Sequence, residues 1–194
     1  MSRRLHFRSA LLALHVPRKS AAMELRTERL KLICLDQSHL RLYLEHFEQL
    51  EGALNLVLSH AVLTDRVQRA IRMKLAKMAA VDESLHPWYT YWLLVVPALR
   101  FGAGLVGFKG YPDDCGEVEI GYGIDPAVQG QGYMTEAVRA MIGWAFQDPA
   151  CRAVVARDTK KWNIASQRVL AKAGMTVYEE SDDAQCWRID KETE

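Results

Sequence analysis

Strand-like and helix-like patterns of hydrophobic residues follow one another from Met23 onward, with no linker between them. Leu30, Leu32 and Cys34 occupy every second position and predict a first strand. A helix is predicted next from the i, i+3, i+4, i+7 spacing of an amphipathic helix. That spacing is carried by Leu40, Tyr43, Leu44 and Phe47.

A second helix is predicted to begin at a Thr64-Asp65 cap, because a threonine side chain can accept a hydrogen bond from the first helical turn. Three strands are then predicted in close succession, over residues 88–96, 104–110 and 117–124. Since a parallel return needs a long crossover, this close spacing indicates an antiparallel meander. The helix that begins at Thr64-Asp65 has an apolar stripe, which consists of Val67, Ile71, Leu75 and Met78.

The last part of the chain alternates between the two periodicities. The predicted elements are a helix over 135–146, a strand over 153–157, a helix over 163–173 and two strands over 177–178 and 185–189. Residues 117–157 therefore make a strand–helix–strand unit, which predicts parallel strands joined by a right-handed crossover. The whole pattern predicts one domain of the α/β (α+β) class over residues 23–194.

The strand over 117–124 carries carboxylates on one face. Val118, Ile120, Tyr122 and Ile124 share the other face, which is apolar. A strand inside an α/β sheet has apolar residues on both faces, so the face with Glu117 and Glu119 is expected to meet solvent or a cleft. Glu119 is the candidate general base, acting directly or through water, and Glu117 is the weaker candidate. A solvated carboxylate, or an anion that binds the acceptor, is the alternative for Glu119.

A glycine-containing loop follows this strand and leads into the helix that begins near Tyr133. The free N–H groups at a helix start attract anions, and Gly130 and Gly132 allow an anion to approach the backbone. Together these features predict a pyrophosphate cradle. Neither common nucleotide fingerprint is present, and Gly-Gln-Gly taken alone is also typical of a tight turn.

Charge is distributed unevenly along the chain. The formal net charge is +1, yet residues 1–22 hold five cations and no acid, which leaves −4 for the rest. A domain of that charge lacks the many cationic contacts that nucleic acid requires, so we expect no nucleic-acid partner. Residues 1–22 are interpreted as a basic, poorly ordered extension. Their composition also resembles an organelle transit peptide, and charge does not decide between the two.

No metal or membrane is predicted as a partner. The four cysteines lie far apart without a CxxC pair, and the six histidines are scattered. No apolar run approaches the ~20 residues of a membrane-spanning helix. Reduced thiols and the absence of a spanning segment predict a cytoplasmic protein.

Three segments of the chain resemble one family in the family's own order. They are Leu25-Arg26-Thr27-Glu28-Arg29-Leu30, Gln129-Gly130-Gln131-Gly132-Tyr133-Met134, and the stretch from Asn163 to Met175. Over about residues 23–178 they resemble the GNAT superfamily of N-acyltransferases, most closely its branch of RimJ-like and RimL-like ribosomal-protein N-terminal acetyltransferases. The second segment matches the superfamily's pyrophosphate motif, Gln/Arg-x-x-Gly-x-Gly/Ala, at Gln129 and Gly132. Met134 departs from the small residue that is usual at the end of the motif.

The resemblance implies a fold and a cosubstrate. The fold is a central mixed, mostly antiparallel twisted sheet, splayed between its fourth and fifth strands and flanked by about four helices. The cosubstrate is acetyl-CoA, with its pantetheine arm in the splay beside the backbone of Tyr122 and Ile124. Asn163 and Ser166 would contact the arm from the following helix, and Asn163 is also a natural helix N-cap. The implied pyrophosphate-binding residues are Gln129, Gly130, Gln131, Gly132, Tyr133 and Met134.

The resemblance also implies the reaction, which is transfer of an acetyl group to a primary amine by direct attack in a ternary complex. The acceptor would be a protein N-terminal α-amine or a small-molecule amine, and the enzyme a monomer or a homodimer. Many members protonate the leaving thiolate with a tyrosine, but Leu170 occupies that position here. Ser166 is therefore the candidate acid, with Tyr133 as the alternative.

Two other functions remain open at the level of the sequence. A non-catalytic acyl-CoA-binding regulatory module is favoured by Leu170 and Met134, whereas the presence of Glu119 argues against it. An RNA or ribosome adaptor would rest on the basic extension alone.

Overall fold

The computed structural model describes residues 23–192, so the interpretation of residues 1–22 as an extension lies outside the described part. The strands are β1 (Glu24–Arg26), β2 (Lys31–Cys34), β3 (Val57–Leu58), β4 (Trp92–Val96), β5 (Phe101–Phe108), β6 (Glu117–Ile124), β7 (Ala153–Lys160), β8 (Thr176–Glu180) and β9 (Ala184–Asp190). The helices are α1 (Gln37–Glu45), α2 (Phe47–Leu54), α3 (Asp65–Met78), α4 (His86–Tyr89), α5 (Tyr133–Ala145) and α6 (Ile164–Lys172).

One mixed sheet organises the described residues, in the order β1-β2-β4-β5-β6-β7-β9-β8, and β3 pairs with β5 outside that path. Strands β4, β5 and β6 form the predicted antiparallel meander. Strands β6 and β7 are parallel and are joined through α5, as the strand–helix–strand pattern predicted. The mixed, mostly antiparallel sheet of the expected fold is therefore confirmed.

The sheet opens between β6 and β7. These two strands pair only over Glu117–Glu119 and Ala153–Val155, and the rest of β6 has no partner on that side. The pairing of β7 with β9 is interrupted by a β-bulge between Ala156 and Thr159, directly beyond the last paired residue. A bulge bends its strand, which explains why β7 leaves β6 at this point. The predicted splay is thus present.

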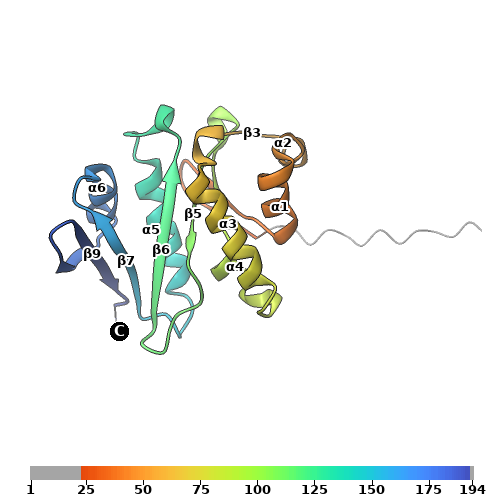
Figure 1. Cartoon of the computed structure of the whole chain (residues 1–194). Helices are drawn as coiled ribbons and strands as arrows, with labels where there is room; N and C mark the ends of the chain where they lie inside the picture. The colour runs from red at the N-terminus through yellow and green to blue at the C-terminus, as the bar shows by residue number, and fades with distance from the viewer. Residues whose placement is uncertain (1–22, 193–194) are drawn as a thin grey trace, which may run out of the picture.

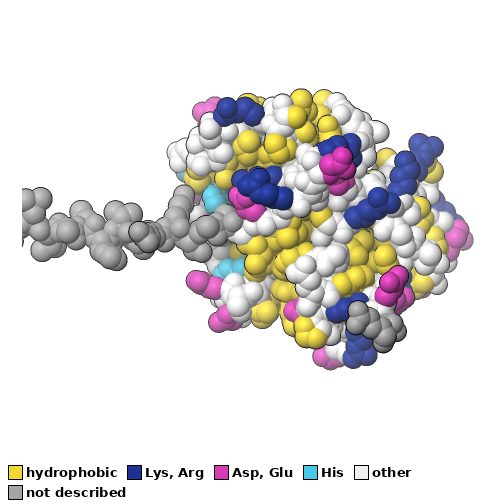
Figure 2. Space-filling view, turned by 180° about the vertical axis from the view of Figure 1, so that it is seen from behind, with side chains coloured by type: hydrophobic (Ala, Val, Ile, Leu, Met, Phe, Trp, Pro, Cys, Tyr) yellow, Lys and Arg dark blue, Asp and Glu magenta, His cyan; other side chains and the backbone are white. Residues whose placement is uncertain are grey.

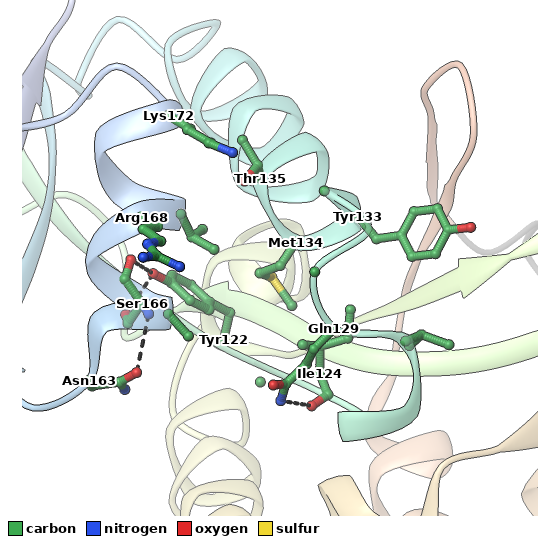
Figure 3. Close-up of a pocket in the computed structure, with 16 residues that line it drawn as sticks. Tyr122, Ile124, Gln129, Tyr133, Met134, Thr135, Asn163, Ser166, Arg168 and Lys172 are labelled. Carbon is green, nitrogen blue, oxygen red and sulfur yellow. Dashed lines mark hydrogen bonds between the residues drawn. The ribbon is translucent and has the colours of Figure 1, made fainter.

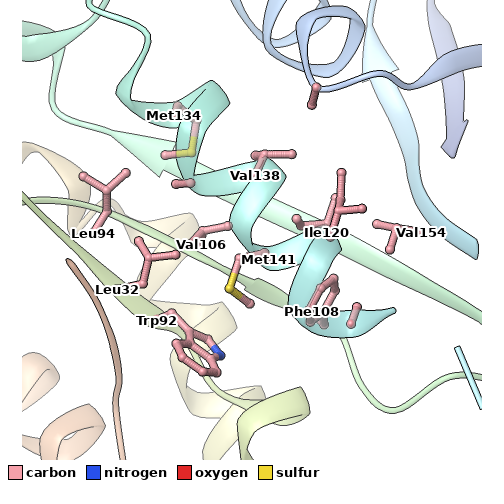
Figure 4. Close-up of a cluster of buried hydrophobic side chains, with 14 of the residues drawn as sticks. Leu32, Trp92, Leu94, Val106, Phe108, Ile120, Met134, Val138, Met141 and Val154 are labelled. Carbon is pink, nitrogen blue, oxygen red and sulfur yellow. The ribbon is translucent and has the colours of Figure 1, made fainter. Parts of the chain in front are cut away.

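Two separate hydrophobic cores hold the sheet, one on each face. The first is built mainly by α5, whose Met134, Val138 and Met141 pack against the sheet, as Figure 4 shows. The second lies under α1, α2 and α3. All five residues of β4 are buried, which is the pattern of a central strand covered on both faces. In Figure 1, α1 to α3 lie to the right of β6, and the C-terminal part from β7 to β9 lies to its left.

The prediction that a strand covers residues 88–96 was wrong for its first residues. Residues 86–89 form the single turn α4, and the strand begins only at Trp92. Pro87 explains the difference, because proline is favoured in the first turn of a helix. Six α-helices are present among residues 23–192, where about four were expected. The single turn α4 is one addition, and the first predicted helix divides at His46 into α1 and α2.

A buried lysine fastens α3 to the sheet where the ladder between β4 and β5 ends. The Nζ atom of Lys74 donates to the carbonyl oxygens of Thr90 at 3.0 Å and Phe108 at 2.5 Å. It also lies 4.5 Å from the centre of the Tyr91 ring. Burial, with added repulsion from Lys77 and Lys109, lowers the pKa of Lys74 to about 7.

The free energy of unfolding should rise with pH because of Lys74. An unfolded chain keeps a lysine pKa near 10.5, so between pH 7 and 10.5 it binds a proton that the folded state does not. The slope from this group is at most about 1.4 kcal/mol per pH unit. Urea unfolding of the protein and of a Lys74→Met variant should give profiles that diverge across this window. Parallel profiles would show that Lys74 keeps its proton when folded.

Candidate active site

A cavity of about 460 Å³ lies in the opening between β6 and α6, beside the start of α5. The loop that follows β6 forms one wall, and α6 forms the opposite wall. Nine of the ten predicted cofactor-binding residues line the cavity: Tyr122, Ile124, Gln129, Gly130, Gly132, Tyr133, Met134, Asn163 and Ser166. The exception is Gln131, and the predicted base Glu119 is not in the lining either.

The start of α5 presents free backbone donors to this cavity. Gly132 is the N-cap of α5, and no side chain forms a cap hydrogen bond there. Gly130 and Gly132 have φ values of 77° and 81°, in the left-handed region where glycine is favoured. The position of a Cβ atom on Gly130 would have no neighbour within 4 Å, so the backbone is open at this point. This geometry is that of an anion cradle at a helix N-terminus.

The unusual Met134 does not obstruct the cradle. Its side chain is buried and packs in the core under α5, although the residue also contributes to the cavity wall. The departure from a small residue is therefore accommodated by core packing, as Figure 4 shows.

The free edge of β6 faces the same cavity. The amide of Lys109 donates to the carbonyl of Glu119, and the amide of Asp125 donates to the carbonyl of Ala103. The odd-numbered residues of β6 thus point their polar groups toward β5, so those of Tyr122 and Ile124 point into the opening. The side chain of Gln129 reaches this edge, where its Nε2 atom lies 3.4 Å from the carbonyl oxygen of Ile124.

A pair of hydroxyl groups crosses the cavity from β6 to α6. The Tyr122 hydroxyl lies 2.9 Å from Oγ of Ser166, and either atom can be the donor. Asn163 caps α6, and its Oδ1 accepts from the Ser166 amide at 3.1 Å. Burial raises the pKa of Tyr122 to about 12, despite the opposing hydrogen bond from Ser166. The tyrosine is therefore a protonated donor at neutral pH.

The sequence had suggested a role for Tyr122 only through its backbone. The side chain was missed because its contact with Ser166 spans the splay and has no signal in local spacing. Tyr133, the alternative acid, has its ring beside the Arg29 guanidinium at 4.9 Å. Figure 3 shows this ring directed away from Ser166 and Tyr122. Leu170 is fully buried in the core and has no proton to donate.

Two cations on α6 add positive charge to the cavity. Arg168 and Lys172 line it, and within residues 23–192 neither forms an ion pair with a carboxylate. Lys160 and Lys161 differ in this respect, since they pair with Asp183 and Glu180 at 3.0 and 2.6 Å. Lys and Arg side chains also lie beside a hydrophobic area on the face shown in Figure 2. An anionic ligand suits the charge of the cavity.

Glu119 lies at the base of the splay, in the last residue pair between β6 and β7. Its carboxylate accepts a hydrogen bond from Lys109 at 2.5 Å and has Arg157 at 4.0 Å. Glu117 is held by Arg157 at 2.6 Å and by Arg188. Further along the same face of β6, a side chain on Gly121 would meet nothing within 4 Å. The face that carries the carboxylates is thus open at the splay.

Within residues 23–192 no group of three or more His, Cys, Asp or Glu side chains could hold a metal ion. In the same range, no helix has both the length and the apolar character needed to cross a bilayer.

Comparison with known proteins adds independent information. The family model of the acetyltransferase (GNAT) domain matches residues 29–176, which is more than half of the chain. The uncharacterised N-acetyltransferase YjdG of Bacillus subtilis (strain 168) is 30% identical over 96 residues, which make up 50% of this chain and 56% of that protein. The chain thus matches about half the length of this relative.

Two solved structures illustrate the likeness of fold. The ribosomal-protein-S5-alanine acetyltransferase from Vibrio fischeri has a TM-score of 0.61 at 19% identity, covering 87% of this chain and 96% of that one. RimL, a ribosomal L7/L12 alpha-N-protein acetyltransferase in complex with coenzyme A, has a TM-score of 0.58 at 19% identity, covering 84% and 95%. These structures share the fold, and the family match over residues 29–176 shows that the chain belongs to the GNAT acetyltransferase family.

Proposed function

We propose that this protein transfers an acetyl group from acetyl-CoA to a primary amine, by direct attack in a ternary complex. The observation that carries the proposal is the cavity in the splay. The free amides at the start of α5 suit a diphosphate, and the exposed edge of Tyr122 and Ile124 suits the amides of a pantetheine arm. Arg168 and Lys172 supply further positive charge for the nucleotide end.

The amine would approach from the opposite face of β6, beside Glu119. An α-amino group has a pKa of about 7.7–8.0 and a lysine side chain about 10.4, so either acceptor profits from a base that removes its proton, the lysine far more. Glu119 is the proposed base because it lies where the two strands part. Its partner Lys109 is 63% exposed, and a water molecule between Lys109 and Glu119 would free the carboxylate to accept the proton.

The hydroxyl pair of Tyr122 and Ser166 is proposed to protonate the departing thiolate. Ser166 gives its proton to the thiolate while Tyr122, 2.9 Å away, gives its own proton to Ser166. Because the raised pKa of Tyr122 disfavours the phenolate that is left, Tyr122 takes a proton back from water and the pair is restored. This arrangement replaces the tyrosine that is usual at the position of Leu170. A thiol pKa of about 8.5 makes such a donor useful without making it indispensable.

A protein N-terminal α-amine is the proposed acceptor, in a monomer or homodimer that acts in the cytoplasm. Support comes from the structural relatives, two of which are named as acetyltransferases of ribosomal proteins. A small-molecule amine is the second candidate, because the cavity itself does not distinguish acceptors.

The proposed function is tested with purified protein and acetyl-CoA, by following release of the free thiol. Short peptides with free α-amines should be acetylated, whereas the same peptides with blocked N-termini and one internal lysine should react far more slowly. Acetylation confined to small amines would contradict the choice of acceptor. Binding of acetyl-CoA without turnover of any amine would favour the regulatory module instead.

Glu119→Gln should lower kcat by at least about 100-fold, because it removes the proton acceptor. The Kd for acetyl-CoA should stay unchanged, since Glu119 lies outside the cavity lining. Glu117→Gln is the matched control on the same face and should retain activity to within about threefold. If Glu119→Gln keeps the rate of the unmodified protein from about pH 6 to pH 9, Glu119 is not the base.

Ser166→Ala should lower kcat by roughly tenfold or more. Because Ser166 also lines the cavity, the Kd for acetyl-CoA is measured beside kcat, so that slower chemistry is separated from weaker binding. Tyr122→Phe should have a smaller effect, because Ser166 is retained and loses only its partner. Ser181→Ala, a substitution far along the chain on a surface turn, serves as the control. Equal kcat values for all four proteins would exclude the hydroxyl pair as the proton donor.

A further inference from the structure

The first family-like segment of the sequence, residues 25–30, lies outside the cavity lining. It lies in the turn between β1 and β2, and in the structure it reaches the first turn of α5. Oγ1 of Thr27 donates to Oε1 of Glu136 at 2.6 Å, and the Arg29 amide donates to the same oxygen at 2.9 Å. Nε of Arg29 donates to Oε2 of Glu136 at 2.7 Å. Both oxygens of this carboxylate are therefore occupied by the turn.

Arg29 also contacts the end of the loop between β6 and α5 directly. Its guanidinium donates to the carbonyl oxygen of Gln131 at 3.0 Å and lies 4.9 Å from the centre of the Tyr133 ring. A Cβ atom on Gly132 would lie 3.4 Å from the same guanidinium. One side chain thus touches three consecutive residues of the loop, and it turns the Gln131 carbonyl toward itself. Gln131 is also the one residue between Gln129 and Met134 that does not line the cavity.

The position of Glu136 creates an electrostatic difficulty for an anion. A carboxylate in the first turn of a helix is attracted by the same positive dipole end that would bind a diphosphate. Burial works against ionisation, but hydrogen bonds from Thr27 and Arg29 hold the pKa of Glu136 below its usual range. The group is therefore negative at neutral pH, and its charge has to be neutralised before a second anion can bind nearby.

We propose that Arg29 is a positioning residue for coenzyme A: it neutralises Glu136 and holds the Gln131 carbonyl away from the diphosphate site. This inference rests on the proposed function. Arg29 acts through the loop and through Glu136, and it does not itself contact the diphosphate. The amides of the loop and of the first turn of α5 then face the cavity with no carboxylate or carbonyl competing for the anion.

The proposal is tested by measuring the Kd for coenzyme A by calorimetry at low salt. Arg29→Gln removes the charge but keeps an amide donor for Gln131, and it should weaken binding by about tenfold or more. The double variant Arg29→Gln/Glu136→Gln removes the unbalanced charge as well, and it should recover to within about threefold of the unmodified protein. Arg26→Ala is the control, since Arg26 pairs with Glu24 at the surface and with no other carboxylate among residues 23–192.

Thermal unfolding of each variant without ligand separates a loss of coenzyme A affinity from a loss of stability. Arg29→Gln should lose coenzyme A affinity even at temperatures where it is fully folded. The inference is wrong if Arg29→Gln binds coenzyme A as tightly as the unmodified protein. It is also wrong if the double variant shows no recovery, which would mean that Arg29 contacts the diphosphate directly. If the unmodified protein itself fails to bind coenzyme A, the proposed function fails and not this inference alone.

Discussion

The structure depends on one constraint: polar backbone groups at the edge of a strand need partners, and β6 loses its partner strand after Glu119. The bulge in β7 opens the gap, and the core under α5 holds both strands through Val118, Ile120 and Val154. Tyr122 and Ile124 then offer N–H and C=O groups toward the cavity. A ligand with its own amides would find unpaired donors and acceptors there, and the proposed binding of the pantetheine arm is based on this edge.

The start of α5 also has backbone groups that lack a partner. The first turn of α5 has amides with no partner inside the helix, and no side chain caps them. Glu136 lies close to these amides, but Thr27 and Arg29 hold its carboxylate in their own hydrogen bonds. The N-terminal turn therefore contributes to a site more than a hundred residues further along the chain, which gives a physical reason for a motif that otherwise forms only a short hairpin.

Much of the fold was predictable because local patterns determine it. The alternation at Val118 and Ile120 describes a face that is buried as expected, and the helix predicted over 135–146 is present as α5. The start of β4 was mispredicted because aromatic residues at 88–89 suit a strand as well as a packed helical turn. The backbone elements of the site were predictable from the loop. The contacts of Tyr122 with Ser166 and of Arg29 with Glu136 were not, because they join residues far apart in the chain and leave no periodic signal.

Hydrogen–deuterium exchange of the full-length protein, with and without acetyl-CoA, tests the central claim most directly. The account predicts that added acetyl-CoA slows exchange at two places: the amides of residues 130–134 at the start of α5, and the free edge of β6 at Tyr122 and Ile124. Protection confined to other segments, or no change at saturating acetyl-CoA, would contradict the account.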